Sequence, residues 1–150
     1  MVIKLKYGFY GADSKSVYPI NDEFKNVGDQ RNLYDLLSNI WCKETCAPRM
    51  QDNWSKDNMT LGQCSITSFL VQDIYGGEVY GIPLGDGNFH CFNKIGDVIF
   101  DLTSEQFKYI LNYDNVVLQS RENHFKKEEK YNRYILLKAK LKEAVKKPRF

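Results

Sequence analysis

The middle of the sequence changes abruptly from a helical to an extended pattern, and this change limits the fold more than any other feature. Apolar residues recur at helical spacing over residues 64–75, and Gly76 and Gly77 then stop the helix. Three extended segments follow, at residues 78–83, 88–95 and 98–102. Gly96 and Asp97 fit a tight hairpin turn between the last two segments. A helix that begins at Cys64 is therefore expected to pack on an antiparallel sheet.

The flanking segments complete an α+β order, with helices first, then the sheet, then a helix. A helical pattern covers residues 30–43, with Asp29 as its N-cap. Residues 46–61 are polar and interrupted by Pro48, which predicts a long loop. Weaker patterns predict further short elements: strands at 2–7 and 116–118, and a helix over 103–111.

The C-terminal segment is strongly basic. Residues 121–150 hold eleven Lys and Arg against four Asp and Glu, a net charge of +7, whereas the remainder carries −5. An apolar stripe on the same segment predicts a basic amphipathic helix over residues 124–147 that docks on the domain. The stripe consists of Tyr134, Leu137, Leu141 and Val145. Because no aromatic residues are interleaved with the basic ones in the manner of a single-strand binder, nucleic acid is not the expected partner.

Length and composition place the chain among ordinary globular proteins. Its 150 residues, 43% hydrophobic and 27% charged, predict a single domain over residues 1–150. Apolar runs are too short for a transmembrane helix, and no secretory signal is recognisable, so the expected compartment is the cytoplasm. Four cysteines in such a compartment are expected to be reduced thiols.

Three side chains have the spacing of a nucleophilic cysteine site. Cys64 follows a glycine turn and begins a helix, where the helix dipole and unpaired N–H groups favour a thiolate. His90 lies in a following strand and can act as the base, and Asp101, eleven residues later, can orient the imidazole. A cysteine at a helix start, a histidine in a strand and an aspartate in the next strand is the papain-like order.

The predicted hairpin has two possible registers, and both bring His90 and Asp101 to one face of the sheet. If Gly96 and Asp97 form the turn, His90 faces Thr103, and Asp101 lies two residues away on the same face. If the turn slips back by one residue, His90 faces Asp101 directly. In either register the imidazole and the carboxylate therefore lie within reach of each other.

Each of these residues also has an ordinary structural explanation when taken alone. A free cysteine is commonly a small buried hydrophobe, and a lone histidine or aspartate commonly satisfies local hydrogen bonds. Gln63, Asn93 and Trp54 are additional candidates for the site. Gln63 could donate to an oxyanion or could simply bond to the loop, and Asn93 and Trp54 could line a cleft or serve in packing.

A zinc site is the competing chemistry, but the spacing disfavours it, and no cofactor or metal is expected. Cys42 and Cys46 have a helical spacing rather than that of a tight knuckle. His90 and Cys91 are neighbours in a strand and should point to opposite faces.

Three stretches carry a family resemblance: residues 62–78, 90–93 and 100–107. Together with shorter stretches at 46–48, 54–55, 120–122 and 133–137, they resemble the YunG-like family of small bacterial proteins. The resemblance spans most of residues 33–141 and implies a papain-like or transglutaminase-like cysteine fold. Cys91 and Met59 depart from the aromatic residue and the proline of typical members, which affects packing near the site more than the three residues themselves.

The sequence therefore favours a cysteine-dependent acyl-transfer enzyme: a peptidase, an amidase, a deamidase or a transglutaminase. Its substrate would be a peptide, a protein side-chain amide or a small amide. The alternative is a non-catalytic binding or structural protein that keeps the fold, since a fold does not establish an activity.

Overall fold

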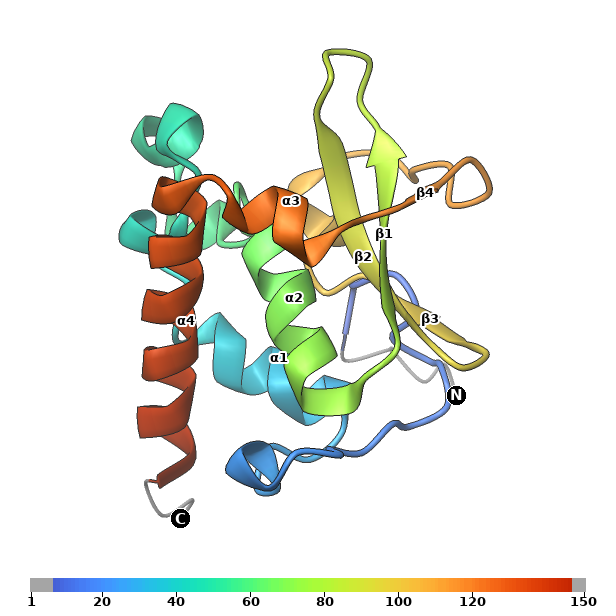
Figure 1. Cartoon of the computed structure of the whole chain (residues 1–150), viewed down its shortest axis with the longest axis vertical. Coiled ribbons are helices and arrows are strands. Elements are labelled where there is room, and N and C mark those ends of the chain that lie inside the picture. Colours follow the sequence, from blue (N-terminus) through green and yellow to red (C-terminus); the bar gives the residue numbers. More distant parts are fainter. Residues whose placement is uncertain (1–6, 147–150) are drawn as a thin grey trace, which may run out of the picture.

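The computed structural model describes residues 7–146 and has a layered architecture, in which helix α2 lies between an antiparallel sheet and helix α4 (Figure 1). The α-helices are α1 (Gln30–Ser38), α2 (Cys64–Tyr75), α3 (Arg121–Phe125) and α4 (Glu128–Lys146). The strands are β1 (Glu78–Pro83), β2 (Phe89–Ile95), β3 (Val98–Phe100) and β4 (Val117–Leu118). Short 3-10 helices are η1 (Asp22–Phe24), η2 (Lys43–Thr45), η3 (Pro48–Asn53), η4 (Lys56–Asn58) and η5 (Ser104–Gln106). The α+β class expected from the sequence is confirmed.

Helix α2 occupies the centre because it is apolar on nearly every side. Eight of its twelve residues are buried, and a helix of this kind must be covered all round. Strands β1 and β2 cover one side and α4 covers another. The buried residues are Ile66, Thr67, Ser68, Phe69, Leu70, Val71, Ile74 and Tyr75. The N-terminus of α2 is thereby held firmly against the sheet.

The sheet has the strand order β3-β2-β1-β4, and all neighbouring strands are antiparallel. Ile95 pairs with Val98, so Gly96 and Asp97 form the turn between β2 and β3. Gly96 has a φ of +60°, as the first position of a type II′ turn requires. The first of the two registers that the sequence allowed is therefore the one adopted.

Helix α1 is shorter than the expected 30–43 and ends at Ser38. Asp29 caps its start as predicted, accepting hydrogen bonds from two backbone N–H groups. At the other end the N–H groups of Ile40 and Trp41 both bond to Leu37 O, which tightens and closes the helix. Trp41 leaves the helix because its ring is buried and its indole N–H donates to Thr67 of α2 at 3.0 Å.

Two other expected elements have different outcomes. The polar stretch over residues 46–61 holds 3-10 helices η3 and η4 and no α-helix, in keeping with a long loop. The helix expected over residues 103–111 is wrong, because only the three residues of η5 are helical there. Its C-cap residue, Phe107, turns to an extended conformation and packs the edge of its ring against His90. Apart from Tyr7, the possible strand at residues 2–7 lies outside the described residues.

The C-terminal helix expected over 124–147 is interrupted and forms two helices, α3 and α4. The break follows Phe125, whose ring packs inward on Phe69 and Tyr134 and turns the chain. The apolar stripe of α4 faces the core as expected, with Tyr134, Leu137 and Leu141 buried. Although α4 is 19 residues long, no helix among residues 7–146 is long and apolar enough to cross a membrane.

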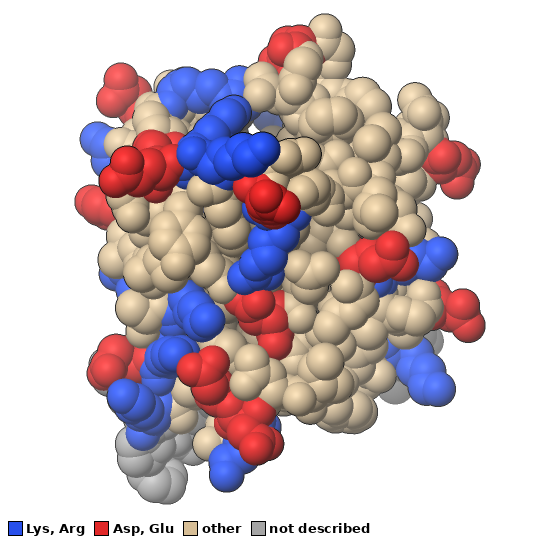
Figure 2. Space-filling model, in the orientation of Figure 1, with Lys and Arg blue, Asp and Glu red and all other residues tan. Residues whose placement is uncertain are grey.

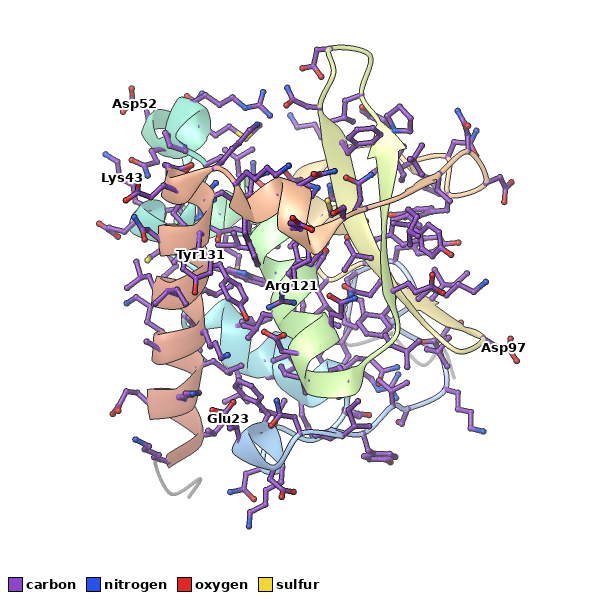
Figure 3. The ribbon with its side chains drawn as sticks, in the orientation of Figure 1. Glu23, Lys43, Asp52, Asp97, Arg121 and Tyr131 are labelled. Atoms are coloured by element: carbon purple, nitrogen blue, oxygen red, sulfur yellow. The ribbon has the colours of Figure 1, made fainter. Side chains whose placement is uncertain are left out.

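Arg121 fastens α2, α3 and α4 together (Figure 3). Its guanidinium forms an ion pair with Asp73 at 2.9 Å and donates to the Tyr134 hydroxyl at 2.7 Å. It also lies over the rings of Phe69, Phe125 and Tyr134, at 5.2 to 5.7 Å from their centroids. Because α3 carries one wall of the cavity described below, this junction fixes that wall to α2.

Candidate active site

Cys64 is the first residue of α2 and follows a turn at Gly62. Gly62 has a φ of +71°, and a Cβ there would lie 2.5 Å from the Cys46 sulfur, so only glycine fits. Gln63 occupies the N-cap, but its side chain does not cap the helix. The N–H groups of the first turn thus remain without intrahelical partners beside Cys64, which is partly buried.

His90 and Asp101 form a buried pair. His90 Nε2 lies 2.6 Å from Asp101 Oδ2, and both side chains are 1% exposed. The β2–β3 register positions them, because both residues lie on the same face of the hairpin. The contact predicted from the sequence is therefore present, and it follows the first register, in which Asp101 lies two residues from the position opposite His90.

The Asp101 carboxylate is held from several directions. Oδ2 also accepts a hydrogen bond from the Tyr113 hydroxyl at 2.8 Å. Oδ1 accepts from the backbone N–H of Thr103 at 3.2 Å and from the Thr103 hydroxyl at 3.4 Å. The backbone of Asp101 is anchored in turn by a bond from its N–H to Tyr10 O at 2.9 Å. A carboxylate fixed in this way also fixes the His90 ring.

The second nitrogen of the His90 ring, Nδ1, is the one left for Cys64. Nδ1 is buried and forms no hydrogen bond with any group among residues 7–146. Because Nε2 is occupied by Asp101, the interaction between the imidazole and the Cys64 thiol falls to Nδ1. Phe107 packs edge-on against the ring, with centroids 4.8 Å apart, and the Cys64 sulfur lies 4.0 Å from Phe89 O. The imidazole and the carboxylate are thus in contact, and the Cys64 sulfur is near enough to the imidazole for their charges to interact.

The two partners shift each other's pKa in opposite directions. The hydrogen bond from the Cys91 thiol and, after it, the hydrogen bond and charge of His90 hold the pKa of Cys64 well below its ordinary value, against the effect of burial. Burial alone would lower the pKa of His90, but Asp101 and then Cys64 outweigh it and raise that pKa to about 10. The pair thus favours thiolate and imidazolium over thiol and imidazole.

Cys91 belongs to the site in a way that the sequence did not predict. Strand alternation turns its side chain away from that of His90, yet both residues are buried and both interact with Cys64. Its hydrogen bond to Cys64 and its burial raise the pKa of Cys91 well above the ordinary value. Cys91 therefore serves as a neutral donor to the Cys64 sulfur. Nothing in the local sequence indicates this, because the contact depends on how α2 packs on β2.

The remaining candidates from the sequence lie away from the Cys64 sulfur. Gln63 is fully buried, and its amide donates to Cys42 O at 3.1 Å. Asn93 is also buried, and its amide donates to Ser68 O at 2.9 Å. Trp54 donates from its indole to Met59 O at 2.9 Å and packs on the core. None of the three lines the cavity that holds Cys64, and each has a bond that explains its position.

A cavity of about 760 Å³ opens beside Cys64 and His90. One part of its wall is apolar, and the other part carries charged and polar side chains from α3, from the start of α4 and from η3. The apolar wall includes Leu61, Leu84, Phe89, Phe107, Val117 and Leu118. A volume of this order accommodates a small molecule or a few residues of a peptide.

No metal site competes for these residues within the described part of the chain. Residues 7–146 contain no group of three or more Cys, His, Asp or Glu side chains placed to hold a metal ion. Cys42, Cys46, His90 and Cys91 are thus not assembled into such a site, and all four cysteines are free thiols.

Comparison with known proteins identifies relatives of the sequence. The model of a family described as "YunG protein" matches residues 29–146. A protein of Bacillus subtilis (strain 168), named "Uncharacterized protein YunG", is 32% identical over 83 residues, which cover 55% of this chain and 70% of that protein. No solved structure matches the chain. The residues matched by the family model include the whole of the candidate site.

Proposed function

The chain belongs to the YunG family, and from the geometry of its own site we propose that it is a cysteine-dependent acyl-transfer enzyme. Cys64 is the nucleophile, His90 the general base and acid, and Asp101 the carboxylate that orients His90. The observation that carries the proposal is the buried contact of 2.6 Å between His90 Nε2 and Asp101, which leaves Nδ1 without a hydrogen bond among the described residues and available to the Cys64 thiol.

The first half of the reaction forms an acyl-enzyme. The Cys64 thiolate attacks the carbonyl carbon of an amide, and the carbonyl oxygen takes up the negative charge. The free N–H groups at the start of α2 lie beside the sulfur and are suited to donate to that oxyanion. His90 then gives its proton from Nδ1 to the leaving nitrogen. The C–N bond breaks, an amine leaves, and a thioester with Cys64 remains.

The second half releases the acyl group. His90 is now neutral and accepts a proton from a water molecule or an amine at Nδ1. The deprotonated oxygen or nitrogen attacks the thioester carbon, and the bond to sulfur breaks. Water as the acceptor gives hydrolysis or deamidation, whereas an amine gives transfer. Asp101 keeps Nε2 protonated throughout, so the same ring nitrogen faces the sulfur in both halves.

The proposal includes the fold, which we infer to be papain-like. Its support is the chain order of the three groups and their setting: the cysteine at the N-terminus of the central helix, the histidine in β2 and the aspartate just after β3. The substrate class that fits such a site is a peptide, a protein side-chain amide or a small amide.

Alkylation by iodoacetamide across pH tests the activated thiolate. An ordinary thiol reacts only near its pKa of 9.0, whereas Cys64 should react fully at much lower pH. Reading each cysteine separately by peptide mass spectrometry makes the partly exposed Cys42 an internal control. Replacement of His90 by Ala should move the Cys64 profile toward that of Cys42, with the contribution of Cys91 remaining, and Asp101→Asn should move it less.

Labelling by an acyl-amide activity probe supplies the second readout. Probe labelling should vanish in Cys64→Ala while the circular dichroism spectrum stays unchanged. Were Cys64 to react only at the pH of Cys42, or only after unfolding, the enzyme proposal would fail. The non-catalytic binding protein would then be the better account.

A further inference from the structure

We propose that the cavity beside Cys64 binds the carboxylate of an anionic substrate, and that the Lys130 ammonium is the group that holds it. The inference rests on the proposed function for the reaction, because it names the substrate class of the same site. The substrate would be an amide or peptide with a carboxylate close to the bond that is cleaved. Three observations lead to it: the partners of Lys130, the state of His124 and the charges around the cavity.

Lys130 is a partly buried cation that lacks an anionic partner. It lies in the first turn of α4 and lines the cavity. Its Nζ lies 2.9 Å from His124 Nδ1, and no carboxylate among residues 7–146 forms an ion pair with it. Burial of a cation is unfavourable without a counter-ion. An anion that enters the cavity would supply one.

His124 positions Lys130 without neutralising it. The Gln119 amide nitrogen donates to Val117 O at 3.0 Å, which fixes its oxygen toward His124 Nε2 at 2.7 Å. His124 must therefore carry its proton on Nε2, and its Nδ1 accepts from Lys130. Burial and, after it, the charge of Lys130 lower the pKa of His124 to about 4, so the ring is neutral near pH 7. The full positive charge thus stays on Lys130.

The rest of the cavity has the same sign of charge. Arg49 and Lys127 also line it, and neither forms an ion pair among the described residues. The only carboxylate in the lining is that of Glu129, which is held by Arg133 one turn along α4. Figure 2 shows Lys and Arg side chains gathered around a hollow between the start of α4 and the β1–β2 hairpin. A cleft of one sign attracts ligands of the other.

Lys130 also lies close enough to the reactive sulfur for their charges to interact. Burial and the charge of Lys127 lower the pKa of Lys130, and the charge of the Cys64 thiolate partly offsets these effects. Cys64 and Lys130 line the same cavity, so a carboxylate bound by Lys130 would share that cavity with the carbon that Cys64 attacks. The apolar part of the cavity wall suits an uncharged remainder of the substrate.

A pair of matched alkylating reagents tests the carboxylate site without a known substrate. Iodoacetate and iodoacetamide differ only in the carboxylate, and both react with the same thiolate, so the ratio of their rates does not depend on the pKa of Cys64. We expect this ratio at Cys64 to exceed the ratio at Cys42 of the same molecule by about tenfold, from the Coulomb attraction of one nearby cation. In Lys130→Gln it should fall several-fold toward the Cys42 value, and Arg49, Lys127 and the His90 imidazolium account for any part that remains.

Two variants control the experiment. Lys130→Arg keeps the charge and should keep most of the ratio, and Lys146→Gln, at the far end of α4 and exposed, should leave it unchanged. An equal ratio at Cys64 and Cys42, or a ratio that survives Lys130→Gln in folded protein, would overturn the carboxylate site. The pH profile with iodoacetamide tests the thiolate, and the ratio of the two reagents tests the carboxylate site. A low-pH profile with equal ratios would therefore overturn the carboxylate site alone, and an ordinary profile would overturn the proposed function.

Discussion

Cys91 illustrates how a neighbour of the nucleophile can matter through its proton. Its thiol is fully buried, and its hydrogen bond is the largest influence that lowers the pKa of Cys64. Two neighbouring thiols cannot both be anionic at little cost, so Cys91, whose pKa is raised, keeps its proton. Cys64 ionises in preference because it also has His90 and the helix start beside it. Cys91 is a positioning and donor group and not a second nucleophile.

Replacement of Cys91 by Ala should raise the pKa of Cys64, because the sulfur loses its strongest donor. The midpoint of the iodoacetamide profile at Cys64 should move to higher pH, and Cys91→Ser, which keeps a donor, should move it less. The Cys42 profile in the same digest serves as the control. A Cys64 midpoint that is identical in Cys91→Ala and the parent protein would show that the contact has no electrostatic role.

Gln63 shows that proximity in sequence does not place a side chain in a site. It directly precedes the nucleophile, but its amide points toward Cys42 O and not toward the sulfur. Its Oε1 is buried without a hydrogen-bond partner among the described residues, so the side chain is committed to the interior. Backbone N–H groups of α2 are therefore better placed than Gln63 to receive an oxyanion.

At the scale of elements, the junction between α2 and β1 depends on Gly77. This glycine has a φ of +74°, and a Cβ there would lie 2.4 Å from Lys94 O and 2.9 Å from the Cα of Ile95. The backbone turns there so that β1 can lie beside β2 directly after the helix. The placement of His90 relative to Cys64 depends on this connection, because it sets how β2 lies against α2.

Gly77→Ala should lower the free energy of unfolding by about 2–4 kcal/mol, because it adds a backbone clash to the strain of a positive φ. Gly85→Ala is the matched control: its φ is +89° and no atom lies within 4 Å of the added Cβ, so it carries the strain alone. Urea denaturation of both variants checks the difference. Equal losses in the two variants would mean that the close approach at Gly77 relaxes freely.

For the molecule as a whole, the buried charge pair links stability to pH. The unfolded chain has a His pKa of 6.5 and a Cys pKa of 9.0, whereas folding raises the pKa of His90 and lowers that of Cys64. Between these values the folded pair and the unfolded pair hold the same number of protons. The pair therefore contributes a stability that is flat from pH 6.5 to 9.0, and it is lost at lower and at higher pH.

Cys64→Ala removes the thiolate of this pair and should change how the free energy of unfolding depends on pH. The raised pKa of His90 then contributes fully below pH 6.5, and its contribution declines as pH rises toward the folded value. The slope should reach about 1.4 kcal/mol for each pH unit, relative to the parent protein. Urea denaturation at a series of pH values measures the difference between the two proteins. Parallel profiles would contradict a charged Cys64–His90 pair.

Local patterns in the sequence determined much of this architecture. The apolar spacing of residues 64–75 and the glycines after it define α2, and Gly96 and Asp97 define the hairpin that joins His90 to Asp101. These features follow from interactions between residues close in the chain, whose geometry hardly depends on the rest of the molecule. For the same reason the predicted end of α1 was wrong, because Trp41 leaves that helix for a partner 26 residues away.

The sequence by itself therefore determined the α+β order, the start of α2 and the contact between imidazole and carboxylate. Only the tertiary structure decided which other groups surround the sulfur: Cys91 as a donor, and Lys130 of α4 with the neutral His124 as a cation facing the cavity. Periodicity and turn chemistry act over a few residues, whereas these contacts arise where α2, β2 and α4 pack together. Their charges are set by burial and by partners distant in the chain, which no local pattern encodes.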